Sequence, residues 1–165
     1  MEIFEAIKGR RSIRKYKKDK EIDKKTLEEI VDAGKYAASA RSEYPWKFIV
    51  ITSRERIKQL TEIVGSNGKF MADASAAIVV ICKDTKYYLE DGSAATQNIL
   101  LAAYAKGVGT CWIAGDKKDY FEKVLSFVNA PSGYKLVSII SCGIPDEKPV
   151  KPKPDLKDIL VWEKL

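Results

Sequence analysis

The feature that most limits the fold of this chain is its alternation between short runs of β-forming residues and longer segments of helical spacing. Such runs are typical of buried strands, and apolar residues at helical spacing are typical of packed helices. Helices of unequal length around about four or five strands fit a three-layer α+β sandwich as well as a doubly wound sheet. We favour the α+β sandwich, with helices flanking a central sheet. The predicted strands are Trp46–Thr52, Ala76–Cys82, Thr110–Ala114 and Lys135–Cys142.

Local signals predict five helices around these strands. Gly9 breaks the first helical pattern, Asp23 is suited to cap the second helix, and Gly107 lies where a left-handed residue ends the fourth. A loop with Asn67 follows the third helix. The predicted helices are Glu2–Lys8, a helix from Asp23 to near Ser39, Arg54–Val64, a long apolar helix within Glu90–Lys106, and Asp116–Phe127.

A chain of 165 residues that is 45% hydrophobic and 32% charged has the size and composition of one globular domain. We therefore expect a single domain over residues 1–165. The longest apolar runs, Ala76–Cys82 and Ile99–Ala105, are far shorter than the roughly 20 residues that span a bilayer. Residues 1–14 lack the apolar segment and cleavage site of a secretory signal. The sequence thus predicts no membrane segment and a cytoplasmic location.

The cysteine and histidine content excludes several classes of enzyme. Cys82, Cys111 and Cys142 lie singly in apolar stretches, without the close spacing of a zinc, iron–sulfur or dithiol site. We interpret them as small core residues and expect no metal. The chain has no histidine, so it has neither a His-based triad nor an imidazole acid–base pair.

Positive charge is concentrated at the start of the chain. Residues 1–20 hold eight Lys or Arg and three Asp or Glu, which leaves a net charge of +5 out of the +6 of the whole chain. In an extended RRSIRKY segment, Arg10, Ser12 and Arg14 share one face. Two guanidinium groups and a hydroxyl suit a phosphate or the oxygen-rich edge of a planar cofactor. An exposed basic strand is the alternative interpretation.

The end of the chain carries a second pair of cations. Lys151 and Lys153 alternate with proline residues that stiffen the backbone, so the pair is suited to hold a phosphate. A solvated charged tail is the alternative. The apolar stretch Leu156–Trp162 then needs a surface to dock on, and in so small a chain a second subunit is a candidate.

Two common nucleotide-binding motifs are excluded. The segment GVGTCWIAG, from Gly107 to Gly115, follows a predicted helix and precedes a strand, whereas a Rossmann fingerprint needs the reverse order. No GxxxxGK[ST] sequence is present, so the chain has no P-loop for ATP or GTP.

Four landmarks in order along nearly the whole chain resemble the nitroreductase family of FMN enzymes. They are RRSIRKY, SARSEYPWKFIV from Ser39, AATQNILLAAYAKGVGTCWIAG from Ala94, and CGIPDEKPVKPKPDLKDILVWE from Cys142. Each is weak alone, but their order and separations are specific. The resemblance implies a nitroreductase-like α+β fold that forms a homodimer, with two FMN molecules bound between the subunits.

The resemblance also assigns roles to residues of this chain. The N-terminal basic segment would contact the phosphate, ribityl chain and pyrimidine edge of FMN, and the C-terminal lysines would approach the phosphate. The stretch from Ala38 to Ser42 would reach the flavin of the other subunit. Asn67 would give a polar contact, and a strand end would lie along the ring near N5. The implied cofactor-binding residues are Arg10, Arg11, Ser12, Arg14, Ala38, Ser39, Ala40, Ser42, Asn67, Ile113, Ala114, Gly115, Lys151 and Lys153.

The activity that the resemblance implies is transfer of hydride from NAD(P)H through FMN to a nitroaromatic, quinone or similar acceptor, with ping-pong kinetics and no catalytic side chain. An FMN storage or sensor protein without fast turnover is an alternative, and a basic nucleic-acid-binding module is another. The chain departs from the family pattern at three positions, because Ser42, Tyr44 and Lys153 stand where Asn, Gln and Arg are usual. Lysine lacks the bidentate fork of arginine, so we expect weaker binding of the phosphate.

Overall fold

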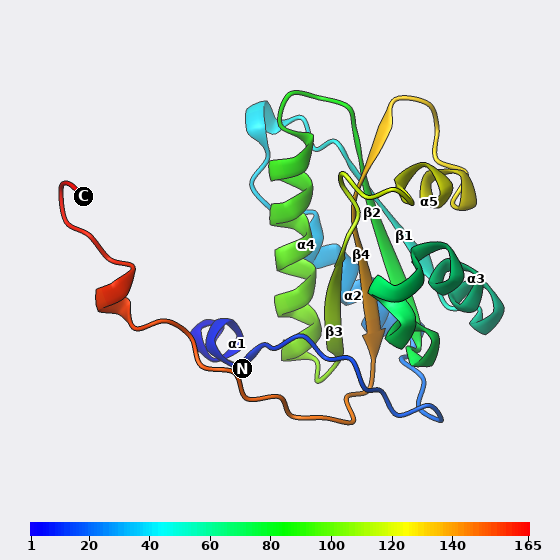
Figure 1. Cartoon of the computed structure of the whole chain (residues 1–165), viewed down its shortest axis with the longest axis horizontal. Coiled ribbons are helices and arrows are strands. Elements are labelled where there is room, and N and C mark those ends of the chain that lie inside the picture. Colours follow the sequence, from blue (N-terminus) through cyan, green and yellow to red (C-terminus); the bar gives the residue numbers. More distant parts are fainter.

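The computed structural model describes residues 1–165 and has three layers, with a central sheet between two layers of helices (Figure 1). None of its helices has the length and apolar character needed to cross a membrane. The elements are, in chain order, α1 (Ile3–Gly9), α2 (Lys24–Gly34), β1 (Trp46–Ile51), α3 (Arg54–Val64), β2 (Ala76–Lys83), α4 (Tyr88–Ala105), β3 (Gly109–Ala114), α5 (Phe121–Phe127) and β4 (Tyr134–Gly143). Three short 3₁₀ segments complete them: Ala40–Ser42, Gly65–Asp73 and Leu156–Asp158.

The sheet has four strands in the order β1-β2-β4-β3, and every neighbouring pair is antiparallel. One row of aligned residues crosses the whole sheet, from Ile49 through Val79 and Ile139 to Ile113. An all-antiparallel sheet excludes the doubly wound alternative, which needs parallel strands. The predicted α+β sandwich is therefore confirmed, at the lower end of the expected number of strands.

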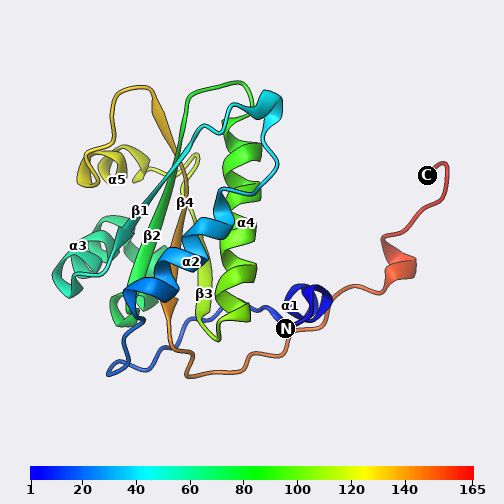
Figure 2. The same cartoon turned by 180° about the vertical axis from the view of Figure 1, so that it is seen from behind.

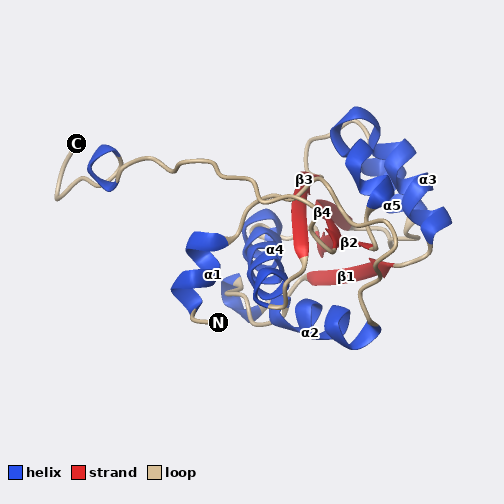
Figure 3. Cartoon of the chain, turned by 90° about the horizontal axis from the view of Figure 1, so that it is seen from below, coloured by secondary structure: helices blue, strands red, loops and turns tan.

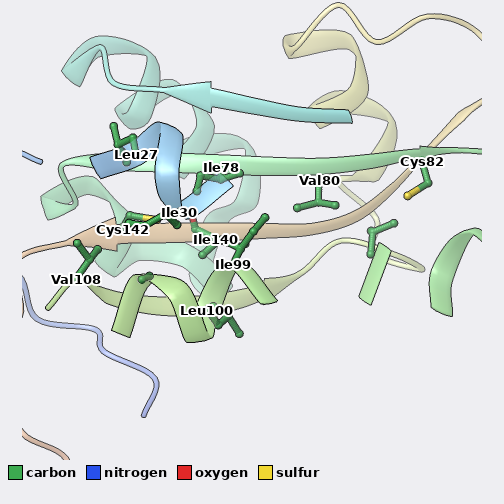
Figure 4. Packing of buried hydrophobic residues seen from close by; sticks show 13 residues of the cluster. Leu27, Ile30, Ile78, Val80, Cys82, Ile99, Leu100, Val108, Ile140 and Cys142 are labelled. Atoms are coloured by element: carbon green, nitrogen blue, oxygen red, sulfur yellow. Dashed lines mark hydrogen bonds between the residues drawn. The ribbon is translucent and has the colours of Figure 1, made fainter. Parts of the chain in front are cut away.

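Alternate residues of the buried strands supply two separate hydrophobic cores, one on each face of the sheet. On β2, Ile78 and Val80 face α2 and α4, whereas Val79 and Ile81 face α3 and α5. Figures 2 and 3 show that α1, α2 and α4 lie on one side of the sheet and α3 and α5 on the other. In Figure 4, Ile99 of α4 reaches Ile140 of the sheet. Because side chains alternate along a strand, a continuous apolar run such as β2 supplies core residues to both faces of the sheet.

Two predicted helices are shorter in the structure, one because of a hydrogen bond between distant residues and the other because of a local turn. The second helix was expected to reach near Ser39, but α2 ends at Gly34, and Ser39 is extended (φ −134°). The side chain of Ser39 binds a carboxylate of α4, which draws the chain away from the helix axis. The helix predicted from Asp116 begins at Phe121, because Lys117 has a positive φ of 58° that does not fit a right-handed helix.

All three cysteines are buried, which confirms their interpretation as core residues. Burial raises the pKa of Cys82 and of Cys142 to about 12, so both thiols are protonated at neutral pH. A protonated, buried thiol reacts slowly with disulfides and alkylating agents.

Gly92 allows α4 to pack closely against the sheet. A Cβ atom at this position would lie 2.6 Å from a Cγ of Val137 and 2.9 Å from the Sγ of Cys82. The pattern of the long helix therefore includes a glycine where alanine would favour helix formation by about 1 kcal/mol.

We predict that Gly92→Ala lowers the free energy of unfolding by about 1–3 kcal/mol, because the added methyl group overpacks the core by more than the helix gains. Urea denaturation measures this change. The neighbouring variant Ser93→Ala also introduces alanine into α4, but it adds no atom because serine already has a Cβ, and it is expected to unfold like the wild type. A Gly92→Ala protein as stable as the wild type would contradict the close packing.

Candidate functional site

The basic segment near the N-terminus lies along the free edge of the sheet. We call residues Arg10–Tyr16 the N-terminal strap. Ser12 forms a parallel bridge with Thr110 of β3, and Tyr16 forms an antiparallel bridge with Pro145, just after β4 (Figure 1). The strap therefore pairs with the start of β3 and with the segment after β4. Its residues do not share one face as expected, because Arg10 lines a cavity together with Arg11 whereas Arg14 lies over Phe70.

The buried side chain of Tyr16 anchors the strap to β4. Its hydroxyl lies 2.7 Å from the carbonyl oxygen of Ile13 and 2.7 Å from the Oγ of Ser141. A phenol has one hydrogen to donate, so it donates to Ile13 and accepts from Ser141. Burial raises the pKa of Tyr16 far above its ordinary value, and the anchor stays neutral.

Glu147, in the segment after β4, binds the backbone of the strap. Its Oε1 accepts hydrogen bonds from the backbone N–H groups of Arg14, at 2.5 Å, and Lys15, at 3.1 Å. A carboxylate that accepts two backbone N–H groups holds both the position and the direction of the chain. The side chains of the strap are thus set by contacts with β3, with β4 and with the segment after β4.

Arg10 and Arg11 line a cavity of about 340 Å³ between the strap, α1, the end of α4 and the segment after β4. The terminal Nη1 of Arg11 donates to the carbonyl oxygens of Lys8 and Arg10, but its Nε is buried without a hydrogen-bond partner. A buried N–H without an acceptor is costly, and a ligand that brings an acceptor relieves that cost. The cavity is lined by Gly9, Arg10, Arg11, Ile13, Tyr104, Gly107, Val108, Gly109, Thr110, Pro145, Glu147, Lys148, Pro149 and Val150.

Arg14 belongs to a different part of the site. Its guanidinium lies over the ring of Phe70, 5.8 Å from the ring centroid. Phe70 belongs to the 3₁₀ segment Gly65–Asp73, which also contains Asn67. In the same segment Gly68 packs beside Ile113 of β3, since a Cβ there would lie 3.6 Å from the Cδ1 of Ile113. The structure therefore brings together the strap, the Asn67 segment and the second half of β3.

Cys111 reports the electrostatics of this region. Burial raises the pKa of its thiol, and the positive charge of Arg14, the nearby hydroxyl of Ser12 and the charge of Arg10 oppose that rise. The cationic groups of the strap thus act together on the middle of β3. A negative charge placed in the same region would be stabilised by them.

The end of β3 is held by two phenols that the sequence patterns do not mark. Ala114 is exposed, and its carbonyl oxygen accepts a hydrogen bond from the hydroxyl of Tyr120. Asp116 accepts a hydrogen bond of 2.6 Å from Tyr88 at the start of α4, which raises the pKa of Tyr88 to about 12. Gly115 is buried against Leu136. The backbone at Ala114 is therefore rigid and accessible.

The remaining predicted site residues are not brought to the strap within one chain. The Ala38–Ser42 loop contacts Asp91, in the first turn of α4, whereas the cavity is lined by Tyr104 near the end of that helix. Thirteen residues of helix separate these two positions by roughly 20 Å. Lys151 and Lys153 are exposed in a tail that leaves the body of the molecule (Figure 1).

Glu147 and Asp91 were not identified as site residues from the sequence, because their hydrogen-bond partners are distant along the chain. Arg14 is 133 residues from Glu147, and Ser39 and Ala40 are 52 and 51 residues from Asp91. No local pattern marks Glu147. Asp91 had a usable signal, because it is an acidic residue on the otherwise apolar buried face of α4. The structure contains no group of three or more His, Cys, Asp or Glu side chains placed to bind a metal.

Comparison with known proteins agrees with this geometry. The profile of the Nitroreductase family matches residues 7–80 and 66–144 of the chain. A Methanothermobacter thermautotrophicus protein provisionally named an NADH dehydrogenase/NAD(P)H nitroreductase is 38% identical over 155 residues, which are 90% of this chain and 80% of that protein. An Archaeoglobus fulgidus protein of the same provisional name is 39% identical over 156 residues, covering 89% of this chain and 88% of the relative.

A solved structure gives the same result. The FMN-dependent nitroreductase of Clostridium difficile R20291 superposes with a TM-score of 0.89 at 31% identity, covering 98% of this chain and 99% of the other. From the profile match and from relatives of such identity and coverage, we conclude that the chain belongs to the nitroreductase family.

Proposed function

We propose that this protein is an FMN-dependent oxidoreductase that transfers hydride from NAD(P)H to a small acceptor such as a nitroaromatic compound or a quinone. Membership of the nitroreductase family and the names of its relatives support this assignment. The structural observation that carries it is the cavity beside the strap, where two arginines meet and the Nε of Arg11 lacks a partner.

The residues present fit FMN. The cavity of about 340 Å³ lies near the lower end of the roughly 300–1,000 Å³ that small-molecule sites occupy, so it suits one part of the cofactor. Arg10 and Arg11, with Lys151 and Lys153 next in the chain after the cavity wall, would hold the phosphate as charged donors. Ser12 and Asn67 would add polar contacts. These role assignments remain predictions.

The second half of β3 would hold the ring. Ala114 is exposed between the buried Ile113 and Gly115, and the outer edge of β3 at this position has no strand partner. The charge of Arg14 would favour negative charge on the pyrimidine edge and thereby the reduced state. The chemistry that FMN supplies when bound is hydride transfer, first from NAD(P)H and then to the acceptor, in a ping-pong order. The protein itself contributes binding, orientation and charge.

We also propose that the protein acts as a homodimer. Within one chain, the Ala38–Ser42 loop lies roughly 20 Å along α4 from the cavity. A second copy that brings its own loop to the strap would complete the site. Large apolar side chains are exposed as well: on α1, Ile3 and Phe4 are 65% and 67% exposed. Such clusters are typical of surfaces that a partner covers.

The C-terminal tail supports the same proposal. Residues 151–165 extend away from the body of the chain in all views, and Trp162 is 78% exposed (Figures 1, 2 and 3). We infer that each tail packs into a groove of about 660 Å³ on the partner, beside the unpaired outer edge of β1. The groove is lined by Ile22, Lys24, Leu27, Glu28, Val31, Asp32, Lys35, Phe48, Val50 and Thr52.

If the tail holds the dimer together, the double variant Ile159→Asp/Trp162→Asp should be largely monomeric, because two buried apolar contacts are replaced by charges. Light scattering after gel filtration measures the mass. Lys157→Asp adds the same kind of charge to the tail without removing an apolar contact, and it should remain dimeric. The tail contact would be refuted by a double variant with the dimer mass, or by a monomeric wild type.

The proposed activity is tested by adding FMN to the purified protein, removing free FMN by desalting, and adding NADH or NADPH without oxygen. We predict that the protein keeps the visible bands of oxidised flavin and that one of the two nucleotides bleaches them rapidly. Arg10→Ala should weaken FMN binding by about tenfold or more through loss of a charged hydrogen bond. Lys123→Ala, on the far side of the sheet, is the matched control and should bind FMN normally.

The other outcomes have clear meanings. A protein that retains no FMN contradicts the proposed function. Retained flavin that both nucleotides reduce only slowly indicates a storage or sensor protein. A flavin-free protein that binds nucleic acid with a steep dependence on salt would favour the basic nucleic-acid-binding module.

A further inference from the structure

Asp91 is the only carboxylate of α4 that is buried, with 4% of its surface exposed. Its Oδ2 accepts a hydrogen bond of 2.8 Å from the hydroxyl of Ser39, and its Oδ1 accepts one of 3.0 Å from the backbone N–H of Ala40. The Oγ of Ser39 in turn accepts a hydrogen bond of 2.9 Å from the backbone N–H of Tyr44. One carboxylate therefore ties both ends of the Ser39–Tyr44 loop to the helix.

No cation neutralises this carboxylate. None of the salt bridges of the structure includes Asp91, although several link exposed residues elsewhere. A buried charge without a counterion is expensive unless hydrogen bonds satisfy it. The two donors of the loop and the N-terminal end of the α4 dipole are what compensate Asp91. The loop and the carboxylate thus depend on each other.

The loop itself needs such support. Arg41, Ser42 and Tyr44 have positive φ values of 56°, 55° and 46°, and they are half of the six non-glycine residues with positive φ in the chain. Each such residue is strained by about 1–3 kcal/mol and persists only when its surroundings hold it. The loop, with the sequence SARSEY, contains neither glycine nor asparagine, the residues that adopt positive φ most easily. The hydrogen bonds of Asp91 and Ser39 bracket the strained residues and fix them.

We propose that Asp91 is a positioning residue for flavin binding, because its buried carboxylate holds the Ser39–Tyr44 loop in the one conformation that meets the flavin of the partner chain. The inference rests on the proposed function, in which this loop contacts the flavin of the other subunit. Asp91 itself lies beneath the loop and does not touch the flavin. Its action is to set the backbone of Ala40 and the residues that follow.

The test compares Asp91→Asn with Thr96→Val on the same helix. Asparagine keeps the shape of Asp91, but its amide nitrogen is a donor and satisfies only one of the two loop donors. Thr96 is also buried, and its hydroxyl donates to the carbonyl oxygen of Gly92 and accepts from Ser138 of the sheet, with no bond to the loop. Thr96→Val therefore removes two buried hydrogen bonds of α4 that do not involve the loop.

Two quantities are measured. Hydrogen exchange of the peptide that contains Ala40 and Tyr44, followed by mass spectrometry on flavin-free protein, reports the loop without reference to the cofactor. Fluorescence titration with FMN reports the affinity. In Asp91→Asn we expect both the exchange rate and the dissociation constant to rise by about tenfold, the equivalent of one hydrogen bond. Thr96→Val should leave both within about twofold of the wild type.

Several results would overturn the inference. One is loop exchange in Asp91→Asn that equals the wild type, and another is faster exchange with unchanged FMN affinity. A wild type that does not bind FMN refutes the proposed function, which is seen before any variant is compared, and the inference falls with it. If Asp91→Asn does not fold, Ser39→Ala removes the same contact from the loop side and is interpreted in the same way.

Discussion

The pairing of the N-terminal strap with the edge of β3 is the interaction on which the rest of the site depends. Ser12 bridges Thr110 in the sheet, Tyr16 is buried against Ser141, and Glu147 binds the strap backbone from the other side. Without these contacts the strap would be a mobile basic peptide. With them, Arg10 and Arg11 are fixed at a cavity, and Arg14 is fixed over Phe70.

The length of α4 separates two parts of the candidate site. The strap and cavity lie at the C-terminal end of α4, and the Ser39–Tyr44 loop lies at its N-terminal end, where Asp91 holds it. A single chain thus carries the cavity and the Ser39–Tyr44 loop at opposite ends of its longest helix. In the proposed homodimer, the exposed apolar side chains of the tail and of α1 would pack against the second copy.

Local chemistry made much of the fold predictable from the sequence. Arg54–Val64 forms a helix with the predicted bounds because Ser53 caps it and Gly65, with φ of 67°, ends it. Gly107, with φ of 75°, ends α4 in the same way. No such local signal marks the early end of α2 or the late start of α5. Those ends are decided by Ser39 binding Asp91 and by the left-handed turn at Lys117, and the first of these is a contact between distant residues.

In the candidate site, too, features set by the local sequence could be predicted and features set by distant contacts could not. The cationic character of the strap could be predicted from the sequence, but the expected common face of Arg10, Ser12 and Arg14 is not found, because Arg10 lines the cavity with Arg11 and Arg14 lies over Phe70. Glu147 and Tyr88 could not be predicted as site residues, since their partners lie 133 and 28 residues away in the sequence. Asp91 carried only the signal of an acidic residue on the buried face of α4, and no local pattern marks the bond from Tyr120 to Ala114. Residues for contact with the cofactor can therefore be nominated from the sequence, whereas most of the residues that position them depend on contacts of the tertiary fold.

The most direct test of this account is a crystal structure of the protein with FMN. The account predicts two flavins per dimer, each with its phosphate at Arg10 and Arg11 of one chain, its ring along Ile113–Gly115 of that chain, and the Ala38–Ser42 loop of the other chain against it. A flavin bound away from the strap, or one whose contacts all come from a single chain, would contradict it.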